Sequence, residues 1–127
     1  MYQVSMGDSG ITVDNKNKKI ALDPNKQPDS DLIFISHAHT DHLYRCAKYN
    51  GEKIISSKIT HKIAMHRGYK YGDLYEEHNF RLLDSGHILG SNGLFVDDEL
   101  YYTGDISIRK RAFMKPAVIP KARILII

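Results

Sequence analysis

The sequence contains very little cysteine and no long apolar run, and each of these absences excludes a class of protein. Its single cysteine, Cys46, excludes an internal disulfide and a cluster of cysteine ligands, so a disulfide-stapled secreted scaffold is not expected. No apolar run approaches the length of a membrane span, and residues Met1 to Asp8 lack the basic and apolar segments of a targeting signal. We therefore expect a soluble cytoplasmic protein without a membrane partner.

An excess of charge of one sign is also lacking. The 18 Lys and Arg residues are nearly matched by 15 Asp and Glu residues, and the formal net charge of +3 permits contact with a polyanion without indicating one. With 127 residues and a hydrophobic share of 42%, the chain is long enough for one modest core. We expect one domain and not two complete ones.

Short apolar runs between turn residues predict mostly strands. A hairpin is expected from Gly10–Asp14 and Lys19–Pro24, with the Asn/Lys cluster of residues 15–18 as its turn. Segment Asp31–Ser36 holds an unbroken apolar run of strand length that ends directly at His37, so a buried strand should deliver this histidine. Further strands are predicted at Lys53–Ser56, Phe80–Asp84, Gly93–Val96, Leu100–Thr103 and Ala122–Ile127.

Two short helices are expected between these strands. Apolar residues at helical spacing predict the first within residues 43–50. The second should begin after Ser57, a good N-cap residue, and should end at Gly68. Ile59 and Ile63 would share one face of this helix.

Three imidazoles and a carboxylate within six positions make the motif His37-Ala38-His39-Thr40-Asp41-His42 the most informative part of the sequence. It directly follows a predicted strand, where a loop can fold these side chains around metal ions. Nitrogen and carboxylate donors suit Zn²⁺, and also Mn²⁺ or Fe, while the lack of a nearby thiolate disfavours a closed structural zinc site. The alternative is a polar loop that is rich in histidine by chance, but the density of donors favours a catalytic type of metal site.

Two isolated residues are ambiguous when each is taken alone. His87 lies in a glycine-flanked turn, residues 84–91, between two predicted strands, where its ring could point into a cleft or simply belong to the loop. Asp105 lies just past a predicted strand end, where it could bridge two cations or serve as an ordinary turn or capping aspartate. Spacing does not decide between these interpretations.

Taken in chain order, the segments SHAHTDH (36–42), SGHILGS (85–91) and YYTGDIS (101–107) resemble the metallo-β-lactamase superfamily. Within it, they are similar to the β-CASP nucleases, which include the cleavage subunit of messenger-RNA 3′-end processing. The resemblance runs from about Leu22 to the C-terminus. It implies a metal-dependent hydrolase that cleaves phosphodiester bonds of RNA, with DNA as a second possible substrate.

The resemblance also implies a two-metal site, with Zn²⁺ as the expected ion. One metal would have three imidazole ligands, the other a carboxylate and an imidazole, and an aspartate would bridge them: His37, His39 and His87; Asp41 and His42; Asp105. Two ions about 3.5–4 Å apart share a water or hydroxide, lower its pKa and clamp a phosphodiester for attack. Asp41 and Asp105 would thereby take part in catalysis.

Other charged residues carry weaker signals. Asp23 corresponds to the superfamily's first conserved aspartate, a structural residue, although from its position before Pro24 it would equally be a turn aspartate. A basic cluster near the C-terminus could contact phosphates but more often forms a solvated surface, so no site role is assigned to Arg109, Lys110, Arg111, Lys115, Lys121 and Arg123.

The sequence departs from the family in the segment after Asp105. No histidine follows His87, although the second metal site of the family needs one more, and the inserted β-CASP domain has no counterpart. We therefore expect an α+β fold in which residues 1–127 form a partial metallo-β-lactamase-like domain, the N-terminal half of an αββα sandwich, with a mixed sheet and flanking helices. Such a half would leave the apolar face of its sheet in water, so a complementary C-terminal half or a second copy should cover it.

Two alternatives to the nuclease remain open. The chain could be a non-catalytic metal-binding fragment or subunit that needs a complementary partner, because the second metal site is one histidine short. It could also be a small-molecule hydrolase from another branch of the superfamily, because only the SGHILGS and YYTGDIS segments favour nucleic acid.

Overall fold

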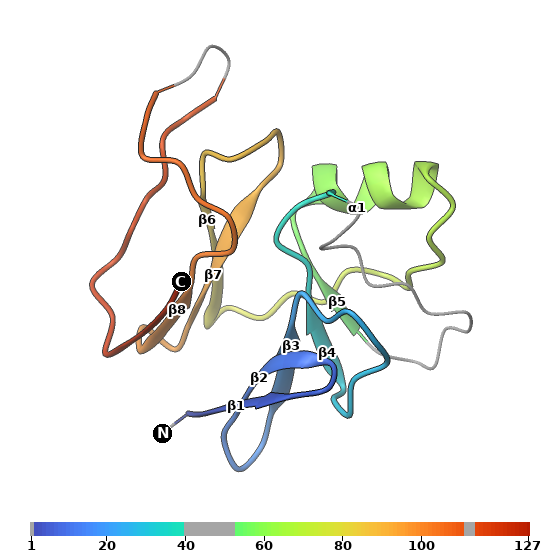
Figure 1. The fold of residues 1–127 in the computed structure, drawn as a ribbon, viewed down its shortest axis with the longest axis vertical. Helices are drawn as coiled ribbons and strands as arrows, with labels where there is room; N and C mark the ends of the chain where they lie inside the picture. The colour runs from blue at the N-terminus through green and yellow to red at the C-terminus, as the bar shows by residue number, and fades with distance from the viewer. Residues whose placement is uncertain (1, 40–52, 111–113) are drawn as a thin grey trace.

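The computed structural model describes residues 2–39, 53–110 and 114–127. Within these ranges the fold is mostly β, with two sheets and a single helix, α1 (Lys58–His66), as Figure 1 shows. With nine residues, α1 is far too short to cross a bilayer, and the described ranges hold no helix that could. The helix predicted within residues 43–50 lies outside the described residues.

The first sheet has five strands in chain order: β1 (Gln3–Gly7), β2 (Gly10–Asp14), β3 (Lys19–Leu22), β4 (Leu32–Phe34) and β5 (Lys53–Ile55). Strands β1 to β3 are antiparallel, and β3 to β5 are parallel. The predicted hairpin of β2 and β3 and the next two strands are confirmed. Strand β1 was not predicted; all five of its residues are exposed, although the apolar Val4 and Met6 alternate with polar residues along it.

The second sheet has four strands: β6 (Phe80–Asp84), β7 (Asn92–Val96), β8 (Leu100–Tyr102) and β9 (Ile124–Ile126). All four were predicted. Strands β6 to β8 form an antiparallel meander, and β9 pairs with β8 in parallel, so this sheet is also mixed.

The two sheets bury a shared core, which corrects the expectation of one sheet with a wet apolar face. Leu32 and Phe34 of β4 lie in one hydrophobic cluster with Leu94 and Val96 of β7 and with Leu100 of β8. Because side chains alternate along a strand, each sheet turns one face toward the other. The second sheet therefore covers the first within this chain, whereas the complete αββα sandwich stays a prediction.

Helix α1 and the segment that follows it, residues 69–74, pack on the opposite face of the first sheet. Ile33 and Ile54, which point away from the shared core, form a second cluster with Ala64 of the helix. The buried residues of α1 are Thr60 and Ala64, whereas Ile59 is 42% exposed, so the predicted Ile59/Ile63 face is rotated from the buried one. The first sheet thus lies between the second sheet on one face and α1 with its following segment on the other.

Both predicted ends of α1 are confirmed. The Ser57 hydroxyl accepts a hydrogen bond from the Thr60 backbone N–H, which is the expected N-cap interaction. At the other end Gly68 has a φ of 91°, and the N–H groups of Gly68 and Tyr69 donate to the carbonyls of Met65 and Ala64. This pair of bonds is a Schellman motif, in which glycine avoids the strain of left-handed backbone.

Asp23, directly after β3, ties the two sheets together. Its Oδ1 accepts a hydrogen bond of 2.8 Å from the backbone N–H of Ser36, and its Oδ2 accepts one of 2.8 Å from the hydroxyl of Tyr102 in β8. Burial, reinforced by the charge and hydrogen bond of Asp23, raises the pKa of Tyr102, so the phenol stays a donor. Asp23 is therefore a structural residue and not merely a turn residue.

We predict that Tyr102→Phe lowers the free energy of unfolding by about 1.5–3 kcal/mol, the usual worth of a hydrogen bond to a charged group. Urea denaturation followed by circular dichroism would measure the change. Tyr75→Phe is the matched control, because the Tyr75 hydroxyl bonds Glu77 only two residues away and joins no sheets. Equal stability of the Tyr102→Phe variant and the wild type would contradict the prediction.

Candidate metal centre

His37 and His39 enter the site from the carboxyl end of β4. The His37 side chain is fully buried, and its Nδ1 lies 2.8 Å from the Ser36 hydroxyl. The backbone of Ser36 is fixed in turn by bonds from Ser36 N–H to Asp23 and from Asn92 N–H to the Ser36 carbonyl. With Nδ1 held in this way, Nε2 is the His37 ring nitrogen that can bind a metal.

His87 enters from the turn between β6 and β7 in the second sheet. Gly86 and Gly90 on either side of it have φ values of 72° and 82°, which side chains rarely adopt. The backbone N–H groups of His87 and Ile88 both donate to the Ser91 hydroxyl at 3.1 Å. The turn is therefore locally fixed, and it aims the His87 ring toward the first sheet.

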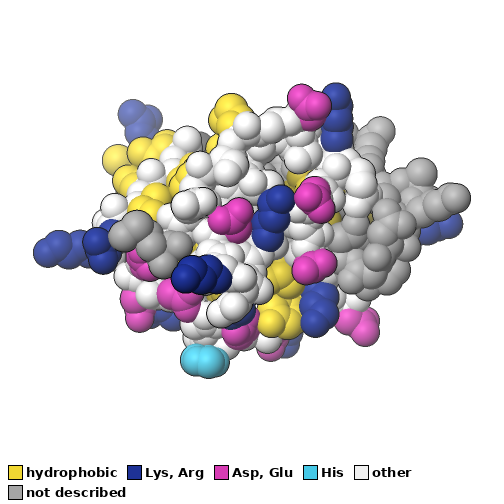
Figure 2. Space-filling model, turned by 90° about the horizontal axis from the view of Figure 1, so that it is seen from below, with side chains coloured by type: hydrophobic (Ala, Val, Ile, Leu, Met, Phe, Trp, Pro, Cys, Tyr) yellow, Lys and Arg dark blue, Asp and Glu magenta, His cyan; other side chains and the backbone are white. Residues whose placement is uncertain are grey.

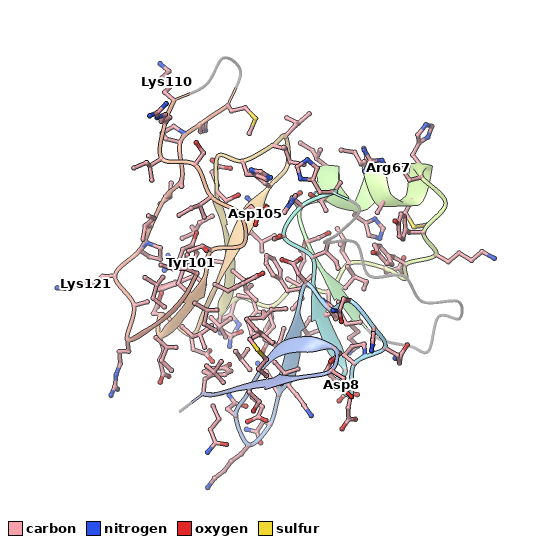
Figure 3. All side chains as sticks on the ribbon, viewed as in Figure 1. Asp8, Arg67, Tyr101, Asp105, Lys110 and Lys121 are labelled. Atoms are coloured by element: carbon pink, nitrogen blue, oxygen red, sulfur yellow. The ribbon has the colours of Figure 1, made fainter. Side chains whose placement is uncertain are left out.

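Asp105 follows β8 and reaches the same place because Gly104, which lacks a side chain, leaves room for the side chain of Ser36. Gly104 has a φ of 57°, and a Cβ atom there would lie 2.7 Å from Cβ of Ser36. This close approach brings Asp105 beside His37. In Figure 3, Asp105 lies at the end of the sheets that is nearer to α1.

The four side chains have the spacing that a single metal ion requires. One donor atom from each of His37, His39, His87 and Asp105 lies within 4.8 Å of the other three. His39 Nδ1 lies 3.2 Å from His87 Nε2, and Asp105 Oδ2 lies 3.4 Å from His87 Nε2 and 3.7 Å from His37 Nε2. Ligands about 2.0–2.1 Å from a tetrahedral Zn²⁺ are about 3.3 Å apart, so these three separations are close to those that the ion needs.

The three imidazole rings are packed edge to face around this point. Their centroids are 4.8 to 4.9 Å apart, with interplanar angles of 80° to 88°. Three cationic imidazoliums at this separation would repel one another strongly, whereas three neutral rings can share one cation. The arrangement can thus hold a metal ion through nitrogen and oxygen donors.

Accessibility differs among the ligand side chains. The side chain of His37 is buried, that of His87 is 24% exposed and that of Asp105 is 46% exposed. A structural metal site is normally closed by its protein ligands, whereas a catalytic one keeps an accessible position. The exposed side of this cluster leaves room for water or a substrate.

The structure brings together four of the six residues predicted as ligands. Asp41 and His42, predicted for a second metal, lie outside the described residues. The basic residues Arg109, Lys110, Lys115, Lys121 and Arg123 are exposed, and Arg111 lies outside the described residues. In Figure 2, Lys and Arg side chains alternate with acidic ones on the face shown, as on an ordinary solvated surface.

Ser36 is a site residue that the sequence did not reveal. It contacts the His37 ring, Asp23 and the Asn92 backbone, yet a serine before a histidine has no distinctive spacing. Its available signals are its place at the end of the buried strand and its position as the first residue of the segment SHAHTDH.

Three imidazoles and a carboxylate thus meet at the adjoining ends of two packed mixed sheets. This cluster makes the protein a candidate metal-binding protein. No family model matches the chain. The chain is similar to an RNase J-like protein of Methanocaldococcus jannaschii, with 25% identity over 143 aligned positions that cover 80% of this chain. Those positions cover 34% of that relative, so the chain spans about a third of its length.

This similarity and the His/Asp cluster together support the metallo-β-lactamase superfamily. The aligned segment covers most of the chain, and the cluster shows that residues from three separate segments meet in space. The messenger-RNA 3′-end processing branch stays a prediction.

We predict that the protein binds Zn²⁺ and that His39→Ala and Asp105→Asn each weaken binding more than about 100-fold, because losing an outer-shell partner alone costs about 10–100-fold. Competition with a chromophoric chelator would measure the affinity. His66→Ala is the matched control, because His66 is exposed at the end of α1. Wild-type affinity in both site variants would refute this assignment.

Proposed function

We propose that this protein is a metal-dependent hydrolase that cleaves phosphodiester bonds of RNA as a β-CASP-like nuclease. The observation that carries the proposal is the convergence of three imidazoles and one carboxylate, from both sheets, within 4.8 Å. The similarity to an RNase J-like protein supports RNA as the substrate class. DNA is the second polyanion that the same chemistry would accept.

The ligand assignment follows from the cluster and from the motif. We assign His37, His39 and His87 to one metal and Asp105 to a bridging position. Asp41 and His42 are assigned to the second metal by their place in the motif. Zn²⁺ is the proposed ion, and Mn²⁺ and Fe suit the same nitrogen and oxygen donors.

The bound ions would lower the pKa of a water molecule and polarise a phosphoryl oxygen. The residues of the chain would place the ions and the substrate relative to one another. His37, held by Ser36 in the buried part of the site, fixes the position of the cluster. Asp105, which is more exposed than His37 and His87, faces the side from which a substrate phosphate would approach.

A second candidate function is metal binding without catalysis by this chain alone. The observation that favours it is that the chain spans about a third of the RNase J-like relative. In that case residues 1–127 would be part of a metallo-β-lactamase-like domain, and a complementary partner or a second copy would complete the active site. The two candidates differ in whether the isolated chain turns over substrate.

Cleavage of a 5′-labelled single-stranded RNA by the purified full chain tests the proposal. We expect cleavage in Zn²⁺ or Mn²⁺, its loss in EDTA and its return when metal is added. Asp105→Asn and Asp41→Ala should each reduce the rate at least about 100-fold, since they remove groups that place the metal and its water. His66→Ala should cleave at the wild-type rate.

Two further substrates separate the alternatives. DNA of the same sequence distinguishes a general nuclease from a ribonuclease, and a chromogenic β-lactam tests small-molecule hydrolysis. Binding of about two metals with no turnover of any substrate would overturn the catalytic proposal and support the non-catalytic one. RNA cleavage that persists in Asp105→Asn would point to a contaminating nuclease and remove the support from this site.

A further inference from the structure

Helix α1 contacts the turn that carries His87. The carbonyl of Gly90 in this turn accepts hydrogen bonds from the Ser57 hydroxyl at 2.6 Å and the Thr60 hydroxyl at 3.0 Å. Thr60 is 1% exposed, so the second bond is shielded from water. The same Ser57 hydroxyl caps the helix by accepting from Thr60 N–H, so one oxygen atom links the start of α1 to the turn.

The contact between α1 and this turn is also steric. Gly90 has a φ of 82°, and a Cβ atom there would lie 2.9 Å from Cβ and Cγ2 of Ile59. A side chain at this position would force the turn away from the helix. Glycine thus allows α1 and the segment with His87 to lie closer together than a larger residue would permit.

The other end of α1 contacts the segment that carries His37 and His39. The guanidinium of Arg67, the C-cap residue, donates a hydrogen bond to the carbonyl of Ala38, between the two histidines. Figure 3 shows Arg67 at the far end of α1 from the second sheet. Ala38 is 1% exposed and packs in the same cluster as Ala64 of the helix.

The two ligand segments come from different sheets, yet both are bonded to one rigid helix. We infer that α1 sets the spacing between the His37–His39 segment and the His87 turn, with Thr60 and Arg67 as positioning residues for the metal centre. Metal ligands must lie within about 0.2 Å of their ideal distances, so a small change in this spacing alters the coordination. The inference rests on the proposed metal centre but not on RNA cleavage.

A purely structural role predicts something different. If these bonds only fasten α1 to the sheets, their loss lowers stability and leaves the folded metal centre unchanged. If they set the spacing, their loss changes metal affinity and geometry in protein that is still folded. Stability and coordination must therefore be measured on the same variants.

Cobalt is a suitable probe, because tetrahedral Co²⁺ in a nitrogen and oxygen site absorbs visible light in a manner that depends on its geometry. We expect Thr60→Val, which keeps the side-chain shape and removes the hydroxyl, to weaken Co²⁺ binding about 10–100-fold and to change the visible spectrum. Thr60→Ser, which keeps the hydroxyl, should retain the wild-type Co²⁺ affinity and the wild-type visible spectrum. Lys62→Ala, at an exposed position of α1, is the control and should match the wild type.

Arg67→Gln is a second variant, at an exposed position, and it tests the same inference if the Thr60→Val protein does not fold. It should also weaken Co²⁺ binding, and Arg67→Lys should recover part of the affinity. Wild-type affinity and spectrum in folded Thr60→Val or Arg67→Gln protein would overturn the inference. Failure of the wild type to bind Co²⁺ would overturn the metal centre itself, whereas Co²⁺ binding without RNA cleavage would overturn only the proposed catalytic function.

Discussion

The carboxylate of Asp23 is the interaction on which the arrangement of the site depends. Its two oxygen atoms accept hydrogen bonds from the Ser36 backbone N–H beside the first sheet and from the Tyr102 hydroxyl of the second sheet. Both bonds are 2.8 Å long. Ser36 then orients the His37 ring, and the segment after Tyr102 leads to Asp105. One partly buried carboxylate thus holds the two sheets together at the point from which the chain continues to His37 and to Asp105. Removing a carboxylate from water is costly unless its hydrogen bonds are made, so this junction tolerates little displacement.

Around this junction, the site is built from short segments that are each restrained by their own neighbours. Gly86 and Gly90 shape the His87 turn, Gly104 lets the Asp105 segment approach Ser36, and α1 contacts both histidine segments. The donor atoms are therefore close before any ion arrives. Such preorganisation favours tight binding, because little conformational entropy is lost on coordination.

Much of this architecture could be predicted from local pattern. The apolar run before His37 predicts β4, and Ser57 and Gly68 predict the ends of α1, because strand periodicity and capping depend on nearby residues. The order of the motifs also predicted that His87 and Asp105 would join the histidines of the motif. The packing of the two sheets on each other was missed, since it depends on side-chain contacts between strands that are far apart in the sequence. Thr60 and Arg67 were missed as contacts of the site, because the polar groups they bond are backbone carbonyls, which every residue possesses.

The bond between Tyr102 and Asp23 joins positions 79 residues apart in the chain. Bringing such distant positions together has a large entropic cost, which only the burial of the shared core can offset. The hairpin of β2 and β3 and helix α1 depend on neighbouring residues and can form early during folding. The junction that orients His37 and places Asp105 must instead wait for the two sheets to dock. We therefore expect the site to be among the last parts of the molecule to take shape, so that its integrity would report on the completeness of the fold.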